Sequence, residues 1–370
     1  MKATYSWLRA LPLLSAGALA ACGGAIGDND STADVEDPVD VTAVVTESLS
    51  TIPTGATPYR GVNLSGADFG SALPGKEWFD YVFPTTSEVD YYLAKGMNTF
   101  RIGFQWERLQ HVAKGAFDTA YWTKLDALVR YATTTKSGYV VLNPQNFARY
   151  YGQPVGSTVV PNAVFADLWR RLASRYKANP RVLFGLVNEP NTMPTEQWVS
   201  AANAAIASIR TAGAPNVVLV PGNGWTGAHS WYDAWYGTSN AVGMLAIKDP
   251  NDNVLFEAHQ YLDSDSSGSS ATCVSSTIGR QRMTAFVRWL RTNKKRGFLG
   301  EFAGARNATC YAAVKDMLTY VMAQSDVLVG WAWWGAGPWW GNYIFTLEPL
   351  SGMDRPQMAI LSPFLFPPRP

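Results

Sequence analysis

From residue 59 onward, short apolar runs alternate with amphipathic stretches, and this alternation constrains the fold more than any other feature of the chain. Several of the runs are almost continuously apolar, which is typical of parallel β-strands that are covered on both faces. Eight runs are expected to be strands, at residues 59–64, 98–104, 139–143, 182–188, 216–221, 254–261, 297–302 and 328–333.

The stretches between these runs carry apolar residues at intervals of three and four, which places them on one face of a helix. The clearest cases are Phe165, Leu168, Trp169, Leu172 and Tyr176, then Trp198, Ala201, Ala202, Ala205, Ile206 and Ile209, then Met283, Phe286, Val287 and Leu290. Eight strands with intervening helices in about 310 residues predict an α/β fold, a single (β/α)8 TIM barrel.

A doubly wound sheet is the alternative fold. That fold normally has a glycine-rich phosphate loop between an early strand and a helix. Residues 60–66 follow the first strand, but they have neither the glycine spacing nor a helix directly behind them. We therefore expect the barrel.

The first 22 residues resemble an export signal, with positive charge from Lys2 and Arg9. Residues 10–21 form an apolar run that is too short to cross a bilayer of about 30 Å. The run ends in Leu-Ala-Ala-Cys, which is similar to the lipobox of bacterial lipoproteins and implies that Cys22 becomes a lipid-modified N-terminus. An exported cell-envelope lipoprotein, at the surface or outer membrane, is expected, with release from the cell or an ordinary signal peptide as alternatives.

Residues 23–58 are rich in Asp, Ser, Thr, Pro and Gly. Such a segment buries too little apolar surface to offset the entropy of ordering it, so we predict a flexible acidic linker. No second change in composition follows. Residues 59–366 are therefore predicted to form one domain.

The chain has three cysteines. If Cys22 carries a lipid, Cys273 and Cys310 remain as an even pair in an oxidising compartment. A disulfide between these two is expected, and two free thiols are the alternative.

The formal net charge of +1 argues against a nucleic-acid partner, because such proteins usually carry a strong basic surplus. Aromatic residues make up 13% of the chain and include 15 tryptophans. They indicate either a large core or a surface that stacks on flat, weakly polar ligands such as sugars. Composition leaves both interpretations open.

Two glutamates lie where strands are expected to end. Glu189 closes the fourth predicted strand within an Asn-Glu-Pro triplet, and Glu301 lies in the seventh. The C-terminal strand ends of a barrel carry its catalytic residues. Two glutamates on opposite sides would face each other across the barrel mouth, as the cleavage of a glycosidic bond requires. Structural ion pairs are the alternative role.

Seven further motifs occur in order along the domain, at residues 61–70, 100–102, 146–150, 184–190, 221–225, 259–265 and 335–337. With these motifs the chain resembles the family 5 glycoside hydrolases, particularly their endo-β-1,4-glucanases, from about residue 60 to residue 350. The resemblance implies that Glu189 is the acid/base and Glu301 the nucleophile of a retaining mechanism. It also implies that Arg101 and Tyr261 favour the charged form of Glu301, and that Asn188 donates to the sugar 2-hydroxyl.

His259 shares one face of its predicted strand with Glu257 and Tyr261, because side chains two residues apart point the same way. Together with the matched motif, this alternation indicates an active-site role for the histidine. No His, Cys or Asp cluster has metal-ligand spacing, so neither a metal nor another cofactor is expected.

Trp334, at the end of the eighth predicted strand, is expected to be a stacking floor for a sugar ring. Trp225, Trp339 and Trp340 extend this platform or serve in ordinary packing, and both roles stay open.

The third strand of the family normally ends in a histidine followed by Asn-(Tyr/Phe)-Ala-Arg, whereas this chain has Gln145 followed by Asn146. Both residues are expected to contact the substrate. Glutamine exchanges hydrogen bonds but carries no proton charge. Because that histidine is neither the acid nor the nucleophile, the departure implies altered sugar binding or lower turnover.

The predicted function is that of a retaining endo-β-1,4-glucanase, acting as a monomer on cellulose-type or mixed-linkage β-glucan. A β-mannanase or glucomannanase would share the fold and both glutamates. A surface glycan-binding protein without turnover is the alternative from another class, and Gln145 motivates it.

Overall fold

The computed structural model describes residues 57–367. Cys22, the predicted signal peptide and nearly all of the predicted linker lie outside the described residues. Among the residues that are described, no helix is both long enough and apolar enough to cross a membrane.

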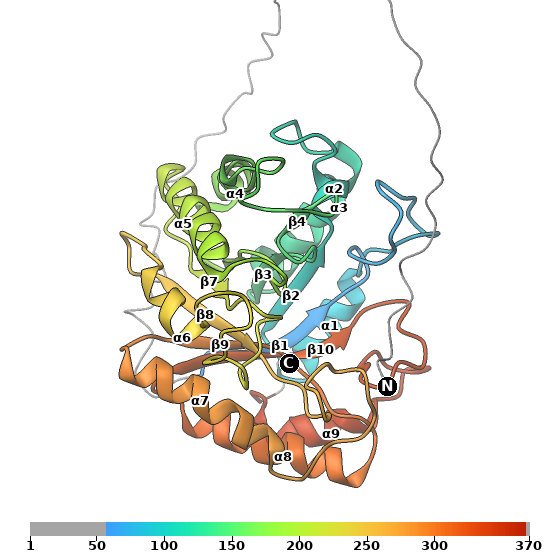
Figure 1. Ribbon diagram of the computed structural model, residues 1–370. Coiled ribbons are helices and arrows are strands. Elements are labelled where there is room, and N and C mark those ends of the chain that lie inside the picture. The colour runs from blue at the N-terminus through green and yellow to red at the C-terminus, as the bar shows by residue number, and fades with distance from the viewer. Residues whose placement is uncertain (1–56, 368–370) are drawn as a thin grey trace, which may run out of the picture. The chain divides into compact units, whose positions relative to one another are not determined.

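Eight parallel strands form a closed barrel in the order β1-β10-β9-β8-β7-β6-β3-β2, which confirms the predicted fold (Figure 1). The strands are β1 (Tyr59–Leu64), β2 (Thr99–Phe104), β3 (Tyr139–Pro144), β6 (Val182–Gly185), β7 (Val218–Pro221), β8 (Val254–His259), β9 (Gly297–Phe302) and β10 (Leu328–Ala336). A small antiparallel hairpin, β4 (Arg149–Tyr150) and β5 (Gln153–Pro154), follows β3.

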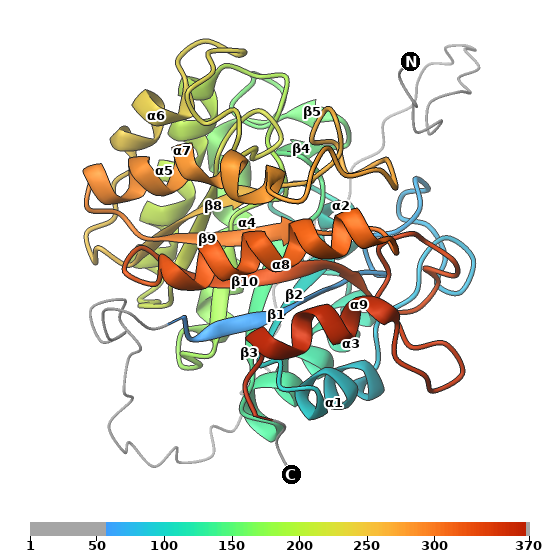
Figure 2. The same cartoon turned by 90° about the horizontal axis from the view of Figure 1, so that it is seen from below.

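Helices lie around the barrel, as Figures 1 and 2 show from two sides. They are α1 (Thr86–Ala94), α2 (Trp106–Leu109), α3 (Thr119–Arg130), α4 (Asn162–Tyr176), α5 (Thr195–Thr211), α6 (Asn240–Gly243), α7 (Ile278–Thr292), α8 (Ala308–Ala323) and α9 (Pro356–Leu361). Every apolar residue that the helical spacing singled out in α4, α5 and α7 is buried. The amphipathic pattern therefore identified the faces that cover the sheet.

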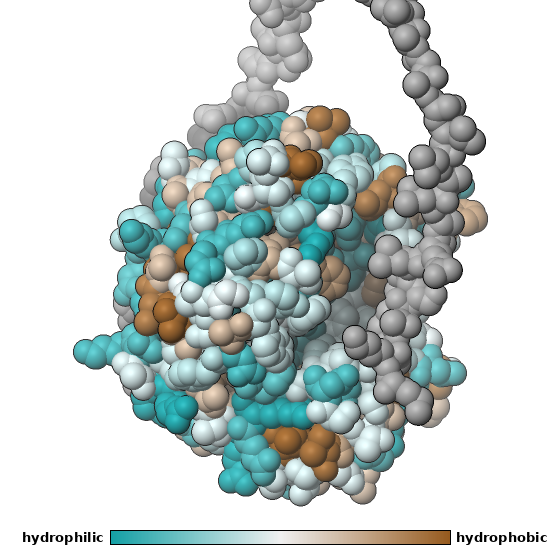
Figure 3. All heavy atoms as spheres, viewed as in Figure 1, coloured by the Kyte–Doolittle hydropathy of each residue, from teal (hydrophilic) through white to brown (hydrophobic). Residues whose placement is uncertain are grey.

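The hydrophobic core has two parts. A small cluster consists mostly of strand residues, and it includes Tyr59, Val141, Leu183, Leu255 and Phe298. A much larger cluster includes the buried faces of the helices. The sequence has fifteen tryptophans, and seven of those within residues 57–367 are fully buried, namely Trp106, Trp169, Trp198, Trp231, Trp289, Trp331 and Trp333. Figure 3 shows the strongly hydrophobic residues of one face in separate small groups. Much of the aromatic content thus fills the core.

Four strands end at other residues than the sequence predicts, and one of them, β3, ends at Pro144 rather than at residue 143. β6 ends at Gly185 rather than at residue 188, and β8 ends at His259 rather than at residue 261. β10 continues to Ala336, three residues beyond the predicted end. Beyond the end of β6, Glu189 has a φ of 43°, a value that lies outside the β region. Asn188 and Glu189 therefore lie beyond the strand rather than at its end.

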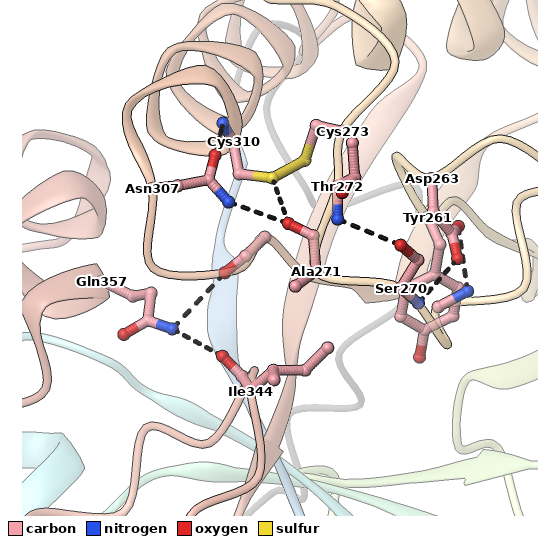
Figure 4. Close-up of a disulfide and its surroundings, with 12 residues drawn as sticks. Tyr261, Asp263, Ser270, Ala271, Thr272, Cys273, Asn307, Cys310, Ile344 and Gln357 are labelled. Carbon is pink, nitrogen blue, oxygen red and sulfur yellow. Dashed lines mark hydrogen bonds between the residues drawn. A yellow bond between two sulfur atoms is a disulfide. The ribbon is translucent and has the colours of Figure 1, made fainter.

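A disulfide joins Cys273 to Cys310, as the cysteine count predicts, with a Cα–Cα distance of 5.3 Å. It connects the long loop after β8 to the first turn of α8 (Figure 4). The bond therefore fixes a loop that starts at the C-terminal end of a barrel strand.

We expect the Cys273→Ala, Cys310→Ala double variant to unfold at a lower temperature than the wild type. Closing a loop of this length, with a sequence separation of 37 between the cysteines, stabilises the fold by about 4 kcal/mol in the chain-entropy model. Calorimetry on the purified proteins measures the difference. A reductant should lower the melting temperature of the wild type and leave the double variant unchanged. Equal melting temperatures for the two oxidised proteins would contradict the expectation.

Candidate active site

Polar side chains from five strands or strand ends converge at one end of the barrel. Parallel strands place their C-terminal ends on the same face, so residues far apart in sequence meet there. The converging residues are Asn63 from β1, Arg101 from β2, Asn188 and Glu189 after β6, Glu257 and His259 from β8, and Glu301 from β9. All of these except Glu189 are almost completely buried.

Both carboxylate oxygens of Glu301 receive a hydrogen bond. Arg101 Nη1 donates to Oε1 at 3.0 Å, and the Tyr261 hydroxyl donates to Oε2 at 2.7 Å. Only 4% of the Glu301 side chain is exposed. A carboxylate held by one cation and one hydroxyl is fixed in orientation.

The guanidinium of Arg101 contacts four side chains of the site, including Glu301. Its Nη1 also donates to Asn63 Oδ1 at 2.8 Å, and its Nη2 donates to Asn188 Oδ1 at 2.8 Å. Its Nε lies 2.9 Å from Glu257 Oε1. Burial alone would lower the pKa of Arg101, but the charges of Glu257 and Glu301 outweigh burial and raise it. The arginine is therefore a permanent positive charge with a fixed planar fork.

Asn188 has a defined amide orientation because an arginine can only donate. Its oxygen is occupied by Arg101 Nη2, which leaves the amide nitrogen as the group that can donate to a ligand. The backbone N–H of Asn188 donates to the Pro144 carbonyl at 2.8 Å, which ties the segment after β6 to β3.

Glu189 holds its proton more tightly than an ordinary glutamate. Burial raises the pKa of this carboxyl, and the charge of Glu301 raises it further, against the opposing influence of His259. Its side chain is 16% exposed, the most accessible in the cluster. A protonated carboxylic acid that still reaches the surface is suited to donating its proton to a ligand.

The backbone of Glu189 is in the left-handed region, with a φ of 43°. This conformation is uncommon for a residue with a side chain, and such outliers cluster at functional sites. The Asn191 side chain donates to the Glu189 carbonyl at 2.9 Å and holds the turn. The turn sends the Glu189 side chain toward His259 rather than along the direction of β6.

His259 lies among three carboxylates. Its Nδ1 is 2.8 Å from Glu189 Oε1 and 3.5 Å from Glu301 Oε2, and its Nε2 is 3.2 Å from Glu257 Oε1. Burial alone would lower the pKa of His259, but the Glu301 charge and the bonds to Glu189 and Glu257 raise it to about 9. At neutral pH the ring is therefore an imidazolium that donates from both nitrogens.

The charges of the cluster favour one protonated carboxyl group. Arg101 and His259 supply two positive charges against three carboxyl groups, so one protonated carboxyl makes the buried cluster neutral. Burial alone would raise the pKa of Glu257, but Arg101 and His259 lower it. Because the pKa of Glu189 is raised instead, the proton is favoured on Glu189 over Glu257.

Glu189, His259 and Glu301 offer three potential metal-ligand atoms within 4.8 Å of one another. His259 Nδ1 and Glu189 Oε1 are only 2.8 Å apart, however, so they share a proton directly and an ion would have to displace it. The arrangement is suited to proton transfer, and no metal enters the chemistry that we derive from it.

A cavity of about 340 Å³ opens from Glu189, His259 and Tyr261 toward the surface. Sequence analysis predicted only Trp225 among its outer lining residues and missed Gly224, Gly227, His229, Trp235, Asp265, Ser266 and Ser267. The missed residues lie in the loops after β7 and β8, which carry no periodic signal. Trp225 is 46% exposed and lines the cavity, where its ring is accessible to a ligand.

Trp334 lies in β10 between two buried neighbours and is itself partly exposed. Trp340 meets it edge-to-face with ring centroids 5.6 Å apart, and Phe69 meets Trp340 in the same way at 4.9 Å. Trp340 also stacks on Tyr343 at 4.5 Å. Trp339 is 47% exposed.

Gln145 and Asn146 lie outside the ionisable cluster. Gln145 accepts a hydrogen bond from Asn143 Nδ2 at 2.6 Å, and its backbone N–H donates to the Phe104 carbonyl. The Asn146 amide donates to the Arg149 carbonyl within its own loop. Within residues 57–367, no hydrogen bond joins either side chain to the charged groups of the cluster.

Asn63 and Glu257 are site residues that sequence analysis did not propose. Asn63 Nδ2 donates to the Gly300 carbonyl at 2.9 Å and to the Trp333 carbonyl at 3.1 Å, so it links three strands beneath Arg101. Glu257 is fully buried between Arg101 and His259. Both are polar residues inside apolar strand runs, and that signal could have identified them.

Comparisons with known proteins agree with this geometry. The sequence profile of the cellulase family, glycosyl hydrolase family 5, matches residues 56–337. Endo-beta-1,4-glucanase B of Aspergillus niger is 43% identical over 293 residues, covering 79% of this chain and 85% of that protein. An endo-beta-1,4-glucanase structure from Xanthomonas axonopodis pv. citri is 50% identical, with a TM-score of 0.80, and covers 82% of this chain and 97% of that chain. The structure of XacCel5A in complex with cellopentaose is 47% identical, with a TM-score of 0.81, and covers 83% of this chain and 99% of that chain.

Proposed function

The chain belongs to glycosyl hydrolase family 5, and on this premise we propose that it is an endo-β-1,4-glucanase that retains anomeric configuration. It is a glycoside hydrolase, as its relatives are. We assign the acid/base role to Glu189 and the nucleophile role to Glu301. Residues 59–366 are the proposed catalytic domain.

The separation of the two carboxyl groups carries the proposal. One carboxyl oxygen of Glu189 and one of Glu301 lie within 4.8 Å of each other. Retaining enzymes place their carboxyl groups about 5–5.5 Å apart, whereas inverting enzymes need about 6.5–9.5 Å to admit a water molecule between acid and sugar. The short separation supports direct attack by Glu301.

In the first step, a carboxylate oxygen of Glu301 forms a bond to the anomeric carbon of the sugar. The bond from that carbon to the leaving oxygen breaks, and the oxygen takes the Glu189 proton. The Asn188 amide nitrogen donates to the 2-hydroxyl, because its oxygen is already held by Arg101. Glu301 loses its negative charge when it becomes an ester, so Arg101 and Tyr261 then face a neutral group.

In the second step, Glu189 removes a proton from water, and the water oxygen attacks the anomeric carbon. The ester bond breaks and Glu301 regains its charge. Glu189 can act as a base at this stage because the negative charge that raised its pKa is absent from the ester. Two displacements return the sugar to the β configuration.

The substrate we propose is β-1,4-glucan, soluble or amorphous cellulose in particular. Relatives named endo-beta-1,4-glucanases and a related structure with cellopentaose support this choice. Reducing-end release from carboxymethylcellulose, mixed-linkage glucan, glucomannan and mannan tests the specificity, and nuclear magnetic resonance of the first product tests the stereochemistry. A first-formed α-anomer, or release from mannan alone, would contradict the proposal.

We expect Gln145→His to raise kcat/KM for cello-oligosaccharides by about threefold to tenfold, the range of one added hydrogen bond. Gln145 replaces the histidine that the family normally has, and in this chain its oxygen is bonded to Asn143. Gln145→Ala is the control, because it loses that bond and adds no imidazole. An unchanged kcat/KM in both variants would show that residue 145 does not reach the substrate.

Export and lipid attachment at Cys22 are part of the proposal, as is action as a monomer. The lipobox-like sequence supports the anchor. In a bacterial host, we expect Cys22→Ser to move activity from the membrane fraction to the soluble fraction. Equal distribution of the two proteins would refute the anchor and leave the proposed reaction untouched.

A further inference from the structure

Gly268, in the loop after β8, lies against the ring of the tyrosine that contacts Glu301. A Cβ atom placed on Gly268 would come within 2.6, 2.7 and 2.8 Å of Tyr261 Cδ1, Cε1 and Cγ. Non-bonded carbon atoms prefer separations of about 3.5–4.0 Å. The observed position of the ring is therefore compatible only with glycine at residue 268.

The Tyr261 ring has little freedom to move. It is 7% exposed, its hydroxyl is bonded to Glu301 Oε2, and Phe345 lies roughly parallel to it at a centroid distance of 6.2 Å. A group that pushes on this ring must therefore displace the hydroxyl from Glu301 or displace the loop that carries the group.

The loop is held by a buried carboxylate. Asp263, 2% exposed, accepts the Gly268 N–H at Oδ1 at 3.1 Å, and its Oδ2 accepts the N–H groups of Ser269 and Ser270 at 3.0 and 3.1 Å. The Ser267 hydroxyl donates to the same oxygen at 3.2 Å. Figure 4 shows Asp263 and Ser270 beside Tyr261. Four donors on one carboxylate fix the position of Gly268.

Both ends of the loop are fastened to helices. Arg282 of α7 donates from Nη1 to the carbonyl oxygens of Tyr261 and Asp263, at 2.9 and 2.7 Å. At the other end, the Cys273–Cys310 disulfide and the bond from Asn307 Nδ2 to the Ala271 carbonyl, at 2.8 Å, connect the loop to the start of α8 (Figure 4).

We propose that Gly268 is a positioning residue for the nucleophile. The loop held by Asp263 and the disulfide places the Gly268 backbone against the Tyr261 ring, and this contact keeps the tyrosine hydroxyl on Glu301. The proposal rests on the assigned role of Glu301 as nucleophile. The same loop lines the substrate cavity through Asp265, Ser266 and Ser267. It therefore both borders the substrate and supports the nucleophile.

The test compares Gly268→Ala with Gly213→Ala. Both glycines have a left-handed backbone, with φ of +69° and +79°, so both substitutions carry the same kind of backbone strain. A Cβ on Gly213 would meet no atom within 4 Å, however. We expect Gly268→Ala to lower kcat on β-glucan by about tenfold to a hundredfold, the range for losing a hydrogen bond to a charged group. KM should stay within about threefold, and Gly213→Ala should match the wild type.

A double-mutant cycle with Tyr261→Phe shows whether the effect passes through the hydroxyl. If it does, Gly268→Ala lowers kcat much less in the Tyr261→Phe background than in the wild type. Equal losses in both backgrounds, a rise in KM alone, or a match to Gly213→Ala would each overturn the proposal. If Gly268→Ala does not fold, the same cycle with Asp263→Asn decides by the same criteria. An inactive wild type would instead refute the proposed function.

Discussion

Replacing Glu301 with glutamine should lower kcat/KM on β-glucan by at least about 10⁴-fold, as expected for removing the nucleophile of a covalent mechanism. Glutamine keeps the size of the side chain and can still accept from Tyr261, which donates at 2.7 Å in the wild type. It cannot form the ester, and it leaves Arg101 opposite a neutral amide. The loss therefore measures the chemistry rather than packing, and single-turnover assays on cello-oligosaccharides quantify it.

Glu196→Gln is the matched control, because Glu196 is an exposed glutamate of α5 outside the cluster. That variant should keep wild-type kcat/KM. A Glu301→Gln protein that hydrolyses β-glucan within about tenfold of the wild type would refute the assignment of the nucleophile.

The fold could be predicted from sequence because its signals are local. An apolar run and a helical spacing are properties of about ten consecutive residues, and α4, α5 and α7 bury every residue that their spacing singled out. The ends of β3, β6, β8 and β10 were wrong because a strand end depends on the neighbouring strands. Beyond Gly185, isolated backbone hydrogen bonds, such as that from Asn188 to Pro144, connect the chain to the adjacent strands.

The site could be predicted only where a residue stood out in its own strand. Glu301, Arg101 and His259 are charged or ionisable residues in otherwise apolar runs, and their proximity follows from the barrel. Asn63 and Glu257 carry the same signal, but their importance depends on what they touch. Only the structure shows that each of them contacts Arg101.

Burial is the larger cause of the raised Glu189 pKa, and the Glu301 charge adds to it. Burial of a side chain results from the packing of several loops, and no single motif contains it. The cavity residues Trp235, Asp265 and Ser266 were missed for the same reason, because they belong to irregular loops.

Replacing Glu189 with alanine should lower kcat/KM on β-glucan by about 10²–10⁴-fold, the usual contribution of a general acid. Both steps lose their proton carrier. A substrate with an acidic leaving group, such as a dinitrophenyl β-cellobioside, needs no proton in the first step. With that substrate the ester should form quickly and break down slowly, which appears as a burst of dinitrophenol followed by a slow steady state.

Azide distinguishes the roles of the two glutamates. It attacks the anomeric carbon without a base, so it should restore steady-state turnover of the Glu189→Ala variant and yield the β-glycosyl azide by displacement of Glu301. If Glu189 were instead the nucleophile, its removal would let azide attack the substrate directly and yield the α-azide. Identification of the azide product by nuclear magnetic resonance therefore decides which glutamate forms the ester.

The pH dependence of kcat/KM tests whether Glu189 is the proton donor. Burial and the Glu301 charge raise the pKa of Glu189, so the acid stays protonated to a higher pH than an exposed glutamate would. As pH rises through that pKa, the proton is lost and kcat/KM on β-glucan should fall. The Glu189→Ala variant on the dinitrophenyl substrate should lack this alkaline decline, because its first step needs no acid. If the decline persists in the variant at the same pH, another group controls it, and His259, with a pKa of about 9, is the next one to test.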